Sequence, residues 1–318
     1  MTKAAPNFGF IKSFGAAFTI CVTAVAPAFA QLKDGTPAER DTMVWATTSV
    51  GTFGNNEQMA FDVRLATPAR DRPSASRIVV ERVSGSPLGD NILLVKPVNG
   101  TSFALVPAVD AGPSTVRLRI FLAPTGGELS AASLARPAGG GAITSPACDL
   151  MMTREAGQFR AVARAACTTA PSEMLFSPRA IWTRDTPSAP FAKMLRARPF
   201  ECYVDMPGSG GINGEVFKRH EGLMLDDQGG EAWFTTTEAT PRQLGLRLRA
   251  VTWPMNNKPG TFSRNSLTLY LIERQPTGEP KLLTYAWTEP GVSRIGLNAQ
   301  WALANCFMEA NSLARPEF

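Results

Sequence analysis

Apolar and polar side chains alternate along much of this chain, and this period of two residues restricts the fold more than any other feature. In one stretch, Val116, Leu118 and Ile120 alternate with Arg117 and Arg119. Successive side chains of a β-strand point to opposite faces, so the stretch predicts a half-buried strand with one apolar and one charged face. Similar stretches recur between turns spaced roughly every 8 to 12 residues, whereas helical periodicity is scarce. The pattern predicts an all-β protein of antiparallel sheets, arranged as barrels or sandwiches.

Two β units in series are expected, one from about residue 43 to 190 and a smaller one from about 198 to 312. Between them, residues 183–200 contain three prolines. Proline cannot donate a ladder hydrogen bond, so this composition is typical of a linker or a domain edge. No clear internal repeat marks the two units as duplicates.

Two turn signals have rival functional interpretations. Asn99-Gly100 lies between two strand-like stretches and predicts a two-residue type I′ hairpin turn. With Thr101 it is also formally a glycosylation sequon, but the turn needs no glycosylating host. Asp226 and Asp227 are consecutive in "DDQGG", where a solvated hairpin tip is favoured over a catalytic pair of carboxylates.

The first thirty residues have the features of a secretory signal peptide. Lys3 and Lys12 precede an apolar run that ends in Ala28-Phe29-Ala30, a small-x-small cleavage site. The run is too short to favour a membrane span, and an uncleaved anchor is the alternative. We expect cleavage after Ala30 and a periplasmic or secreted chain without a transmembrane span.

The cysteines predict two disulfides. The apolar run contains one cysteine, and cleavage leaves four: Cys148, Cys167, Cys202 and Cys306. An even number in an exported chain makes disulfides the default. Of the three pairings, Cys148–Cys167 with Cys202–Cys306 keeps each bridge within one half of the chain, and chain entropy makes these bridges worth about 3 and about 4.7 kcal/mol. No Cys-x-x-Cys spacing supports a zinc site or a thioredoxin-like redox centre.

Charge and histidine content narrow the chemistry further. Without Lys3 and Lys12, 30 basic side chains face 27 acidic ones, and the arginines are dispersed rather than clustered. Nucleic acid is therefore not an expected partner. A catalytic triad would depend wholly on the single histidine, His220, for which a structural role is favoured. The glycine-rich stretch 207–214 matches neither a phosphate-binding loop nor a nucleophile elbow.

Three segments of the first unit carry motifs in a recognisable order. They are a Gly-x-Phe-x-Asn-x-x-Gln-like opening, an Arg-x-Arg strand leading into Phe, and a Cys-Asp hairpin closed by a second Cys after Gly-x-Phe. The order and separation of these motifs resemble the CpcT/CpeT family of chromophore lyases, over roughly residues 45–185. The matching residues are Gly51, Phe53, Asn55, Gln58, Arg117, Arg119, Phe121, Cys148, Asp149, Gly157, Phe159 and Cys167.

The resemblance implies a calycin-like or lipocalin-like antiparallel barrel with a cup. Cyanobacterial relatives deliver a bilin to a cysteine of a phycobiliprotein, so a bilin or another tetrapyrrole is the implied ligand and an acceptor protein the implied partner. Arg117 and Arg119 would pair with the propionates, and Asn55 and Gln58 would complete the site. The rival interpretation places both arginines on a solvent-facing strand surface and uses Asn55 and Gln58 as caps. No cofactor beyond the ligand is required.

The chain also departs from the family pattern. The segment "DNILLVKPVNG" has neither an aromatic residue nor a glutamine where the family commonly has both, which removes stacking surface for a bilin. The second unit has no counterpart in the lyases. The leading hypothesis is an exported, lyase-like barrel that binds an apolar or tetrapyrrole-like ligand. The alternative is a disulfide-stabilised structural or interaction module of the cell envelope without catalytic activity, and a hydrolase built on His220 comes third.

Overall fold

A computed structural model describes residues 35–109, 115–123, 129–135, 146–165, 167–168, 170–207, 217–237, 240–257 and 260–308. The chain divides into two compact units, Met1–Gly35 and Thr36–Phe318. The predicted signal peptide and its cleavage site lie outside the described residues. All the features described below belong to Thr36–Phe318.

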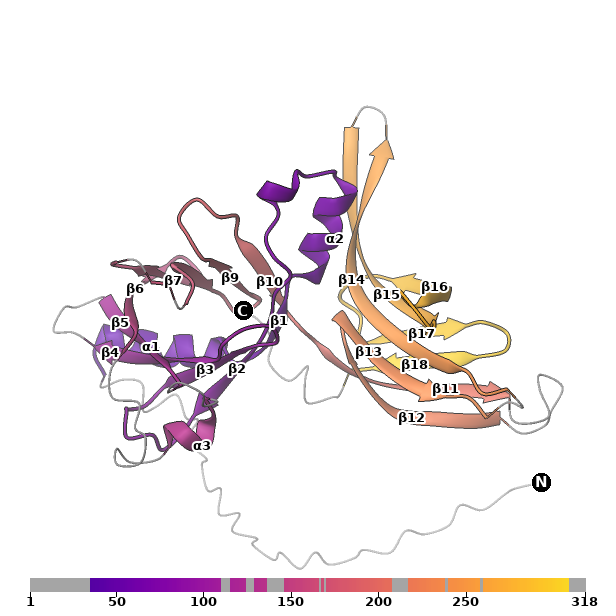
Figure 1. Cartoon of the computed structure of the whole chain (residues 1–318), viewed down its shortest axis with the longest axis horizontal. Coiled ribbons are helices and arrows are strands. Elements are labelled where there is room, and N and C mark those ends of the chain that lie inside the picture. The colour runs from indigo at the N-terminus through magenta and orange to yellow at the C-terminus, as the bar shows by residue number, and fades with distance from the viewer. Residues whose placement is uncertain are drawn as a thin grey trace, which may run out of the picture. The chain divides into compact units, whose positions relative to one another are not determined.

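Ten strands form a closed antiparallel barrel in the order β1-β10-β9-β8-β7-β6-β5-β4-β3-β2 (Figure 1). The pairing of β1 with β10, which sets Phe53 opposite Arg196, closes the sheet on itself. Closure leaves no free strand edge, and this barrel with the antiparallel sheets that follow confirms the predicted fold class. The strands are β1 (Gly51–Gly54), β2 (Arg77–Val83), β3 (Ile92–Pro97), β4 (Phe103–Val109), β5 (Thr115–Leu122), β6 (Cys148–Glu155), β7 (Gln158–Ala163), β8 (Glu173–Phe176), β9 (Ala180–Arg184) and β10 (Ala192–Arg196).

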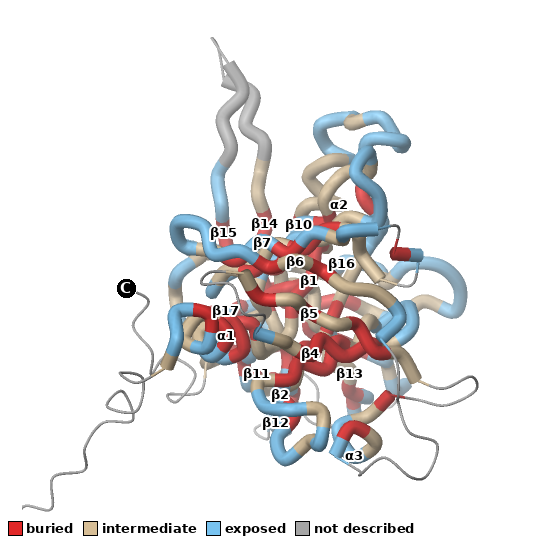
Figure 2. The backbone as a smooth tube through the Cα atoms, turned by 90° about the vertical axis from the view of Figure 1, so that its left-hand side faces the viewer, coloured by how far each residue is buried: buried red, intermediate tan, exposed pale blue. Residues whose placement is uncertain are grey.

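The alternation in the sequence sets which side chains fill the barrel. On β5, Val116, Leu118 and Ile120 are buried in the barrel core, whereas Arg117 and Arg119 point to the other face. Figure 2 shows the buried stretches gathered along strands such as β4 and β5, with exposed residues in the loops. The predicted half-buried strand is confirmed, because only the apolar face of β5 belongs to the core.

A helix closes one end of this core. Helix α1 (Pro37–Thr48) begins with a capping box, in which Thr36 and Glu39 satisfy each other's backbone amides. Its Trp45 is fully buried in the barrel core, and the ring meets Phe176 at the end of β8 edge to face, with 5.7 Å between centroids. The barrel is therefore filled at the end where α1 lies.

Part of the outer barrel surface is also covered. Leu129 and Leu134, beside and within the short helix α3 (Ala131–Leu134), pack with Phe121 of β5 and with outward residues of β3 and β4. Helix α2 (Asn56–Arg64) and the 3-10 turn η2 (Ala69–Asp71) connect β1 to β2. These elements give the barrel a second, smaller apolar cluster outside its wall.

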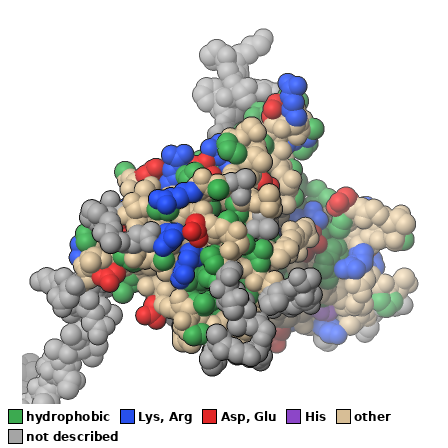
Figure 3. Space-filling model, turned by 60° about the vertical axis from the view of Figure 1, so that its left-hand side comes forward, with side chains coloured by type: hydrophobic (Ala, Val, Ile, Leu, Met, Phe, Trp, Pro, Cys, Tyr) green, Lys and Arg blue, Asp and Glu red, His purple; other side chains and the backbone are tan. Residues whose placement is uncertain are grey.

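Three strands of the barrel are joined by one buried carboxylate. Glu173 on β8 accepts hydrogen bonds from Arg160 of β7 and Arg184 of β9, each with Nε at 2.7 Å. Burial alone raises the pKa of this carboxyl, but the hydrogen bonds and charges of the two arginines outweigh burial and hold it below its usual value. Basic and acidic side chains also lie next to one another on the face drawn in Figure 3.

Replacing Glu173→Gln is expected to lower the free energy of unfolding by about 2 kcal/mol at pH 7, because two charged hydrogen bonds weaken. A carboxyl whose pKa is lowered in the folded state stabilises that state above its unfolded pKa, and this contribution is lost as the pH falls through the folded value. The gap between variant and wild type should therefore narrow below about pH 4 in urea unfolding.

Glu81→Gln is the matched control, since Glu81 pairs with Lys96 at 2.7 Å on the solvated barrel surface. It should cost less than about 1 kcal/mol. Equal losses in the two variants, or a Glu173→Gln effect that does not change with pH, would contradict a structural role for the buried carboxylate.

Eight further strands form two four-stranded antiparallel sheets, β12-β11-β18-β17 and β13-β14-β15-β16. Their inward residues, among them Leu246 and Leu269, form one apolar core. Cys202 and Cys306 face each other in register on β11 and β18 and form a disulfide, as predicted. The strands are β11 (Pro199–Pro207), β12 (Phe217–Asp226), β13 (Gln228–Thr235), β14 (Gln243–Asn257), β15 (Gly260–Glu273), β16 (Lys281–Thr288), β17 (Arg294–Asn298) and β18 (Leu303–Phe307).

Residues 183–200, interpreted from the sequence as a linker or a domain edge, are not a linker without regular structure. Half of this segment belongs to the end of β9, the whole of β10 and the beginning of β11. On β10, Ala192 and Met194 are buried and alternate with exposed Lys193 and Leu195. The barrel thus continues to Arg196, beyond the predicted boundary at 190. The division into two independently folding domains stays a prediction.

The interpretation of Asp226 and Asp227 as a solvated hairpin tip is also wrong. Asp227 is 3% exposed and accepts hydrogen bonds from the backbone N and Nε of Arg198, at 2.9 and 2.6 Å. Asp226 forms an ion pair with Arg77 of β2. The turn between β12 and β13 is bound by two arginines from other strands or connections, so its carboxylates are structural.

Candidate ligand-binding cavity

A cavity of about 720 Å³ opens at one end of the barrel. Its floor consists of inward side chains near strand ends that meet there because neighbouring strands run antiparallel. Each of these residues belongs to the barrel core and is nearly inaccessible to water. The floor residues are Ile78, Val95, Phe103, Met174 and Met194.

The two ends of the barrel differ because α1 is present at only one of them. Met174 lines the cavity, and Phe176, two residues further along β8, packs against Trp45. One strand therefore leads from the open end to the filled end. The interior is neither a fully packed core nor a channel, but a cup with a floor made by the barrel core.

The rim of the cup is polar and comes from loops. Its hydroxyl groups belong to Ser74, Ser76, Thr101, Thr168, Ser172, Thr183 and Thr186. Asp185 carries the one ionisable side chain among the described lining residues, which include no lysine, arginine or histidine. An apolar floor with a few polar groups at the mouth is the usual composition of a small-molecule site.

The loop between β3 and β4 contributes Asn99 and Thr101 to this rim. The last ladder pair is Val95 with Phe103, and residues 98–102 connect the two strands. The hairpin is confirmed, but the predicted two-residue turn at Asn99-Gly100 is wrong. The longer connection is what carries polar side chains to the mouth of the cup.

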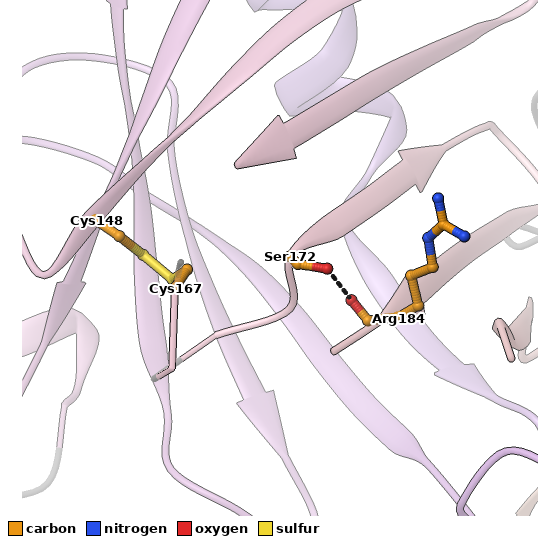
Figure 4. The surroundings of a disulfide bond; sticks show 4 residues. All are labelled: Cys148, Cys167, Ser172 and Arg184. Atoms are coloured by element: carbon orange, nitrogen blue, oxygen red, sulfur yellow. Dashed lines mark hydrogen bonds between the residues drawn. A yellow bond between two sulfur atoms is a disulfide. The ribbon is translucent and has the colours of Figure 1, made fainter. Parts of the chain in front are cut away.

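The disulfide between Cys148 and Cys167 lies at the same end of the barrel and confirms the second predicted pairing. Cys148 begins β6, and Cys167 follows β7 and lines the cavity. In the same part of the rim, the Ser172 hydroxyl donates to the Arg184 carbonyl at 3.2 Å (Figure 4). The bridge therefore ties one side of the rim to the barrel wall.

Asn55 and Gln58 support the barrel rather than line the described cavity. Asn55 is 1% exposed; its Nδ2 donates to the Ser74 carbonyl at 2.8 Å, and its Oδ1 accepts from Ser76 N at 2.6 Å. Gln58 clamps β10 by donating to the Phe191 carbonyl at 2.9 Å and accepting from Lys193 N at 2.7 Å. Asn55 thus holds the rim segment 74–76 in place without lining the cavity itself.

Arg117 and Arg119 lie on the outer face of β5. Arg117 Nη1 is 3.8 Å from Asp149 Oδ2, and the Arg119 guanidinium lies 5.7 Å from the Phe121 ring centre. Neither residue belongs to the described lining of the cavity. The structure does not bring the four predicted binding residues into one site, and their role toward a ligand stays a prediction.

His220 is packed against an aromatic ring on β12. Its ring centre lies 4.6 Å from that of Phe234, and burial, together with the charge of Lys218, lowers its pKa. A histidine packed against a ring in this way has the surroundings expected for the structural role that the sequence favoured. It lies outside the described lining of the cavity.

Sequence reasoning missed the residues that do line the cup. Thr183 and Asp185 were hidden in the supposed linker, and Thr168 and Ser172 follow the second cysteine of the hairpin without any periodic pattern. The alternation of Ala192, Lys193 and Met194 is a strand signal that could have extended the barrel. Loop residues carry no period, so their convergence depends on the closure of the barrel.

Other kinds of evidence add little about function. Within the described ranges, no three His, Cys, Asp or Glu side chains gather where they could share a metal ion. No helix of the described part is both long and apolar enough to span a bilayer. Comparisons with models of protein families, with curated proteins and with solved structures found no match. The cavity is therefore the feature from which a function can be argued.

Proposed function

We propose that the barrel binds a small, predominantly apolar molecule in its cup. The observation that carries this proposal is the difference between the two barrel ends: Trp45 fills one, and the other retains about 720 Å³ above an apolar floor. That volume lies in the range of roughly 300 to 1,000 Å³ typical of ligand pockets. Transfer of an apolar ligand onto this floor is favoured because it removes apolar surface from water.

The rim elements are held in place before any ligand arrives. Asn55 fixes the segment that carries Ser74 and Ser76, and the Cys148–Cys167 bridge fixes the opposite part of the rim. A site whose walls are already ordered loses less conformational entropy on binding. These contacts favour a binding site that is already formed over one that takes shape only when the ligand binds.

A bilin or another tetrapyrrole remains the ligand implied by the CpcT/CpeT resemblance. Its propionates would find no basic partner among the described lining residues, and Arg117 and Arg119 lie on the outer face. We therefore favour a ligand whose recognition does not depend on carboxylates. Titrations with biliverdin and haem test tetrapyrrole binding, which should shift the absorption band of the pigment and be weakened by Arg117→Ala with Arg119→Ala. Delivery of a chromophore to an acceptor protein is a further hypothesis.

An interaction module of the cell envelope is the alternative, favoured by an aromatic surface on the second β unit. Tyr285 and Trp287 of β16 are each 52% exposed. Exposed aromatic residues are more usual at interfaces than on free surfaces, so this surface favours an interaction with a partner. This alternative does not require a ligand in the barrel. It therefore predicts that apolar probes do not bind to the cup.

Titration with the neutral fluorescent probe N-phenyl-1-naphthylamine tests the proposal. Wild-type protein should enhance the probe's fluorescence with saturation, and Thr183→Trp should weaken binding at least tenfold, because an indole at this cavity-lining position fills the cup. Thr183 makes no described side-chain hydrogen bond whose loss would complicate the comparison.

Thr153→Trp is the matched control. Thr153 lies exposed on β6, outside the described cavity lining, so this variant should bind the probe as the wild type does. Both variants should retain the far-ultraviolet circular dichroism of a folded β protein. Absence of saturable binding, or equal binding by Thr183→Trp and wild type, would overturn the proposal.

A further inference from the structure

We propose that the ligand of the cup carries a positively charged group, such as an ammonium, on an apolar body, and that Asp185 binds this group at the mouth. This inference rests on the proposed function of the cavity. Three observations support the inference. The rim carries a negative charge, the Asp185 side chain is exposed and without a described partner, and polar groups at the mouth lie above an apolar floor.

The charge of the rim is opposite to that of the chain. The full sequence carries a formal net charge of +5, yet the described cavity lining has a single charged side chain, the carboxylate of Asp185. A cation entering the mouth therefore meets an attractive group and no repulsive one among the described lining residues. A carboxylate entering the same mouth would be repelled by Asp185 and would find no attractive charge among the described lining residues.

The Asp185 carboxylate is available to a ligand. It is exposed in the loop after β9, and within the described residues it forms no ion pair or hydrogen bond. The adjacent cation, Arg184, is already engaged: Nε donates to Glu173 at 2.7 Å and Nη1 donates to the Pro187 carbonyl at 2.8 Å. Arg184 is thus held by the barrel wall and leaves the charge of Asp185 uncompensated.

Neighbouring rim groups suit an ammonium. The hydroxyls of Ser76, Thr101 and Thr183 and the side-chain carbonyl of Asn99 line the same mouth and can accept N–H hydrogen bonds. Below them lie the apolar floor residues, such as Val95 and Met174. A molecule with a charged head and an apolar tail would place its head at Asp185 and its tail on the floor.

Competition between three ligands of equal chain length tests the inference. Decylamine, decanol and decanoate would each displace bound N-phenyl-1-naphthylamine, below their critical micelle concentrations, at pH 7. Decylamine should bind about fivefold more tightly than decanol, the gain expected of one solvent-accessible ion pair, and decanoate more weakly than decanol. Sodium chloride at about 1 M should reduce the preference for the amine, because it screens the charges over a few ångströms.

Asp185→Asn should abolish the difference between decylamine and decanol by weakening the binding of decylamine. Asp71→Asn is the control, since Asp71 is an exposed carboxylate outside the described lining, and it should retain the preference. Equal binding of amine and alcohol by the wild type, or tighter binding of decanoate, would overturn this inference while the cavity proposal stands. Failure of all three ligands and of the neutral probe would overturn both.

Discussion

A variant with Cys202→Ala and Cys306→Ala is expected to lose about 4.7 kcal/mol of unfolding free energy relative to the oxidised wild type. The bridge joins residues 104 apart in sequence, and both cysteines are buried in the core between the two sheets. Its removal releases a long loop in the unfolded chain, which raises the entropy of that state. Guanidinium unfolding followed by tryptophan fluorescence measures the loss.

The second bridge provides the comparison. Cys148→Ala with Cys167→Ala opens a loop with a sequence separation of 19 and should cost about 3 kcal/mol. It should also weaken probe binding, because Cys167 lines the cup. If the two β units are independent domains, each double variant will shift only one of two unfolding transitions. Oxidised wild type no more stable than either variant would contradict a structural role for the bridges.

Trp45→Ala is expected to lower the unfolding free energy by about 3 to 5 kcal/mol. Trp45 is fully buried and packs against Phe176 at the filled end of the barrel, so its removal leaves a cavity that α1 cannot easily close. Trp45→Phe should cost less than Trp45→Ala. The indole Nε1 is buried without a hydrogen-bond partner in the described structure, so its removal leaves no other polar group unsatisfied.

Trp182→Ala serves as the control for this series. Trp182 lies on the outer face of β9 and is 36% exposed, and its ring contacts Lys193 and Phe191 on the barrel surface. Its truncation should cost clearly less unfolding free energy than that of Trp45 when both variants are unfolded in urea. Equal losses for the two tryptophans would show that α1 does not seal the barrel core.

The parts of the fold that follow from local pattern could be predicted from the sequence. The alternation of Val116 and Leu118 with Arg117 identifies both the strand and its inward face, because a strand repeats every two residues. The pairing of the cysteines followed from their even number in a chain expected to be exported and from their grouping into two halves. Neither inference required knowledge of long-range contacts.

The candidate site could not be predicted in the same way, because it depends on contacts between distant segments. Closure of the barrel pairs Phe53 with Arg196. Arg196 lies in the segment whose prolines suggested a linker. Closure brings the loops that carry Ser76, Thr101 and Asp185 around one opening. These loops have no periodic pattern that reports where they meet.

Charged residues were the least predictable from sequence. Arg117 and Arg119 resemble propionate-binding residues in their motif but lie on the outer face, and Asp227 looked solvated but binds Arg198. A charged side chain on a strand or a turn can bind a ligand, pair with a neighbour or meet solvent, and its sequence pattern is the same in each case. The choice is made by tertiary packing.

Methyl-labelled methionine offers the most direct test of ligand binding in the cup. Met174 and Met194 form part of the cavity floor, whereas Met206 lies in the core of the second β unit. Addition of decanol should shift the methyl resonances of Met174 and Met194 with saturation and leave that of Met206 unchanged. Unchanged resonances of both floor residues at ligand concentrations that saturate the protein would contradict binding in the barrel.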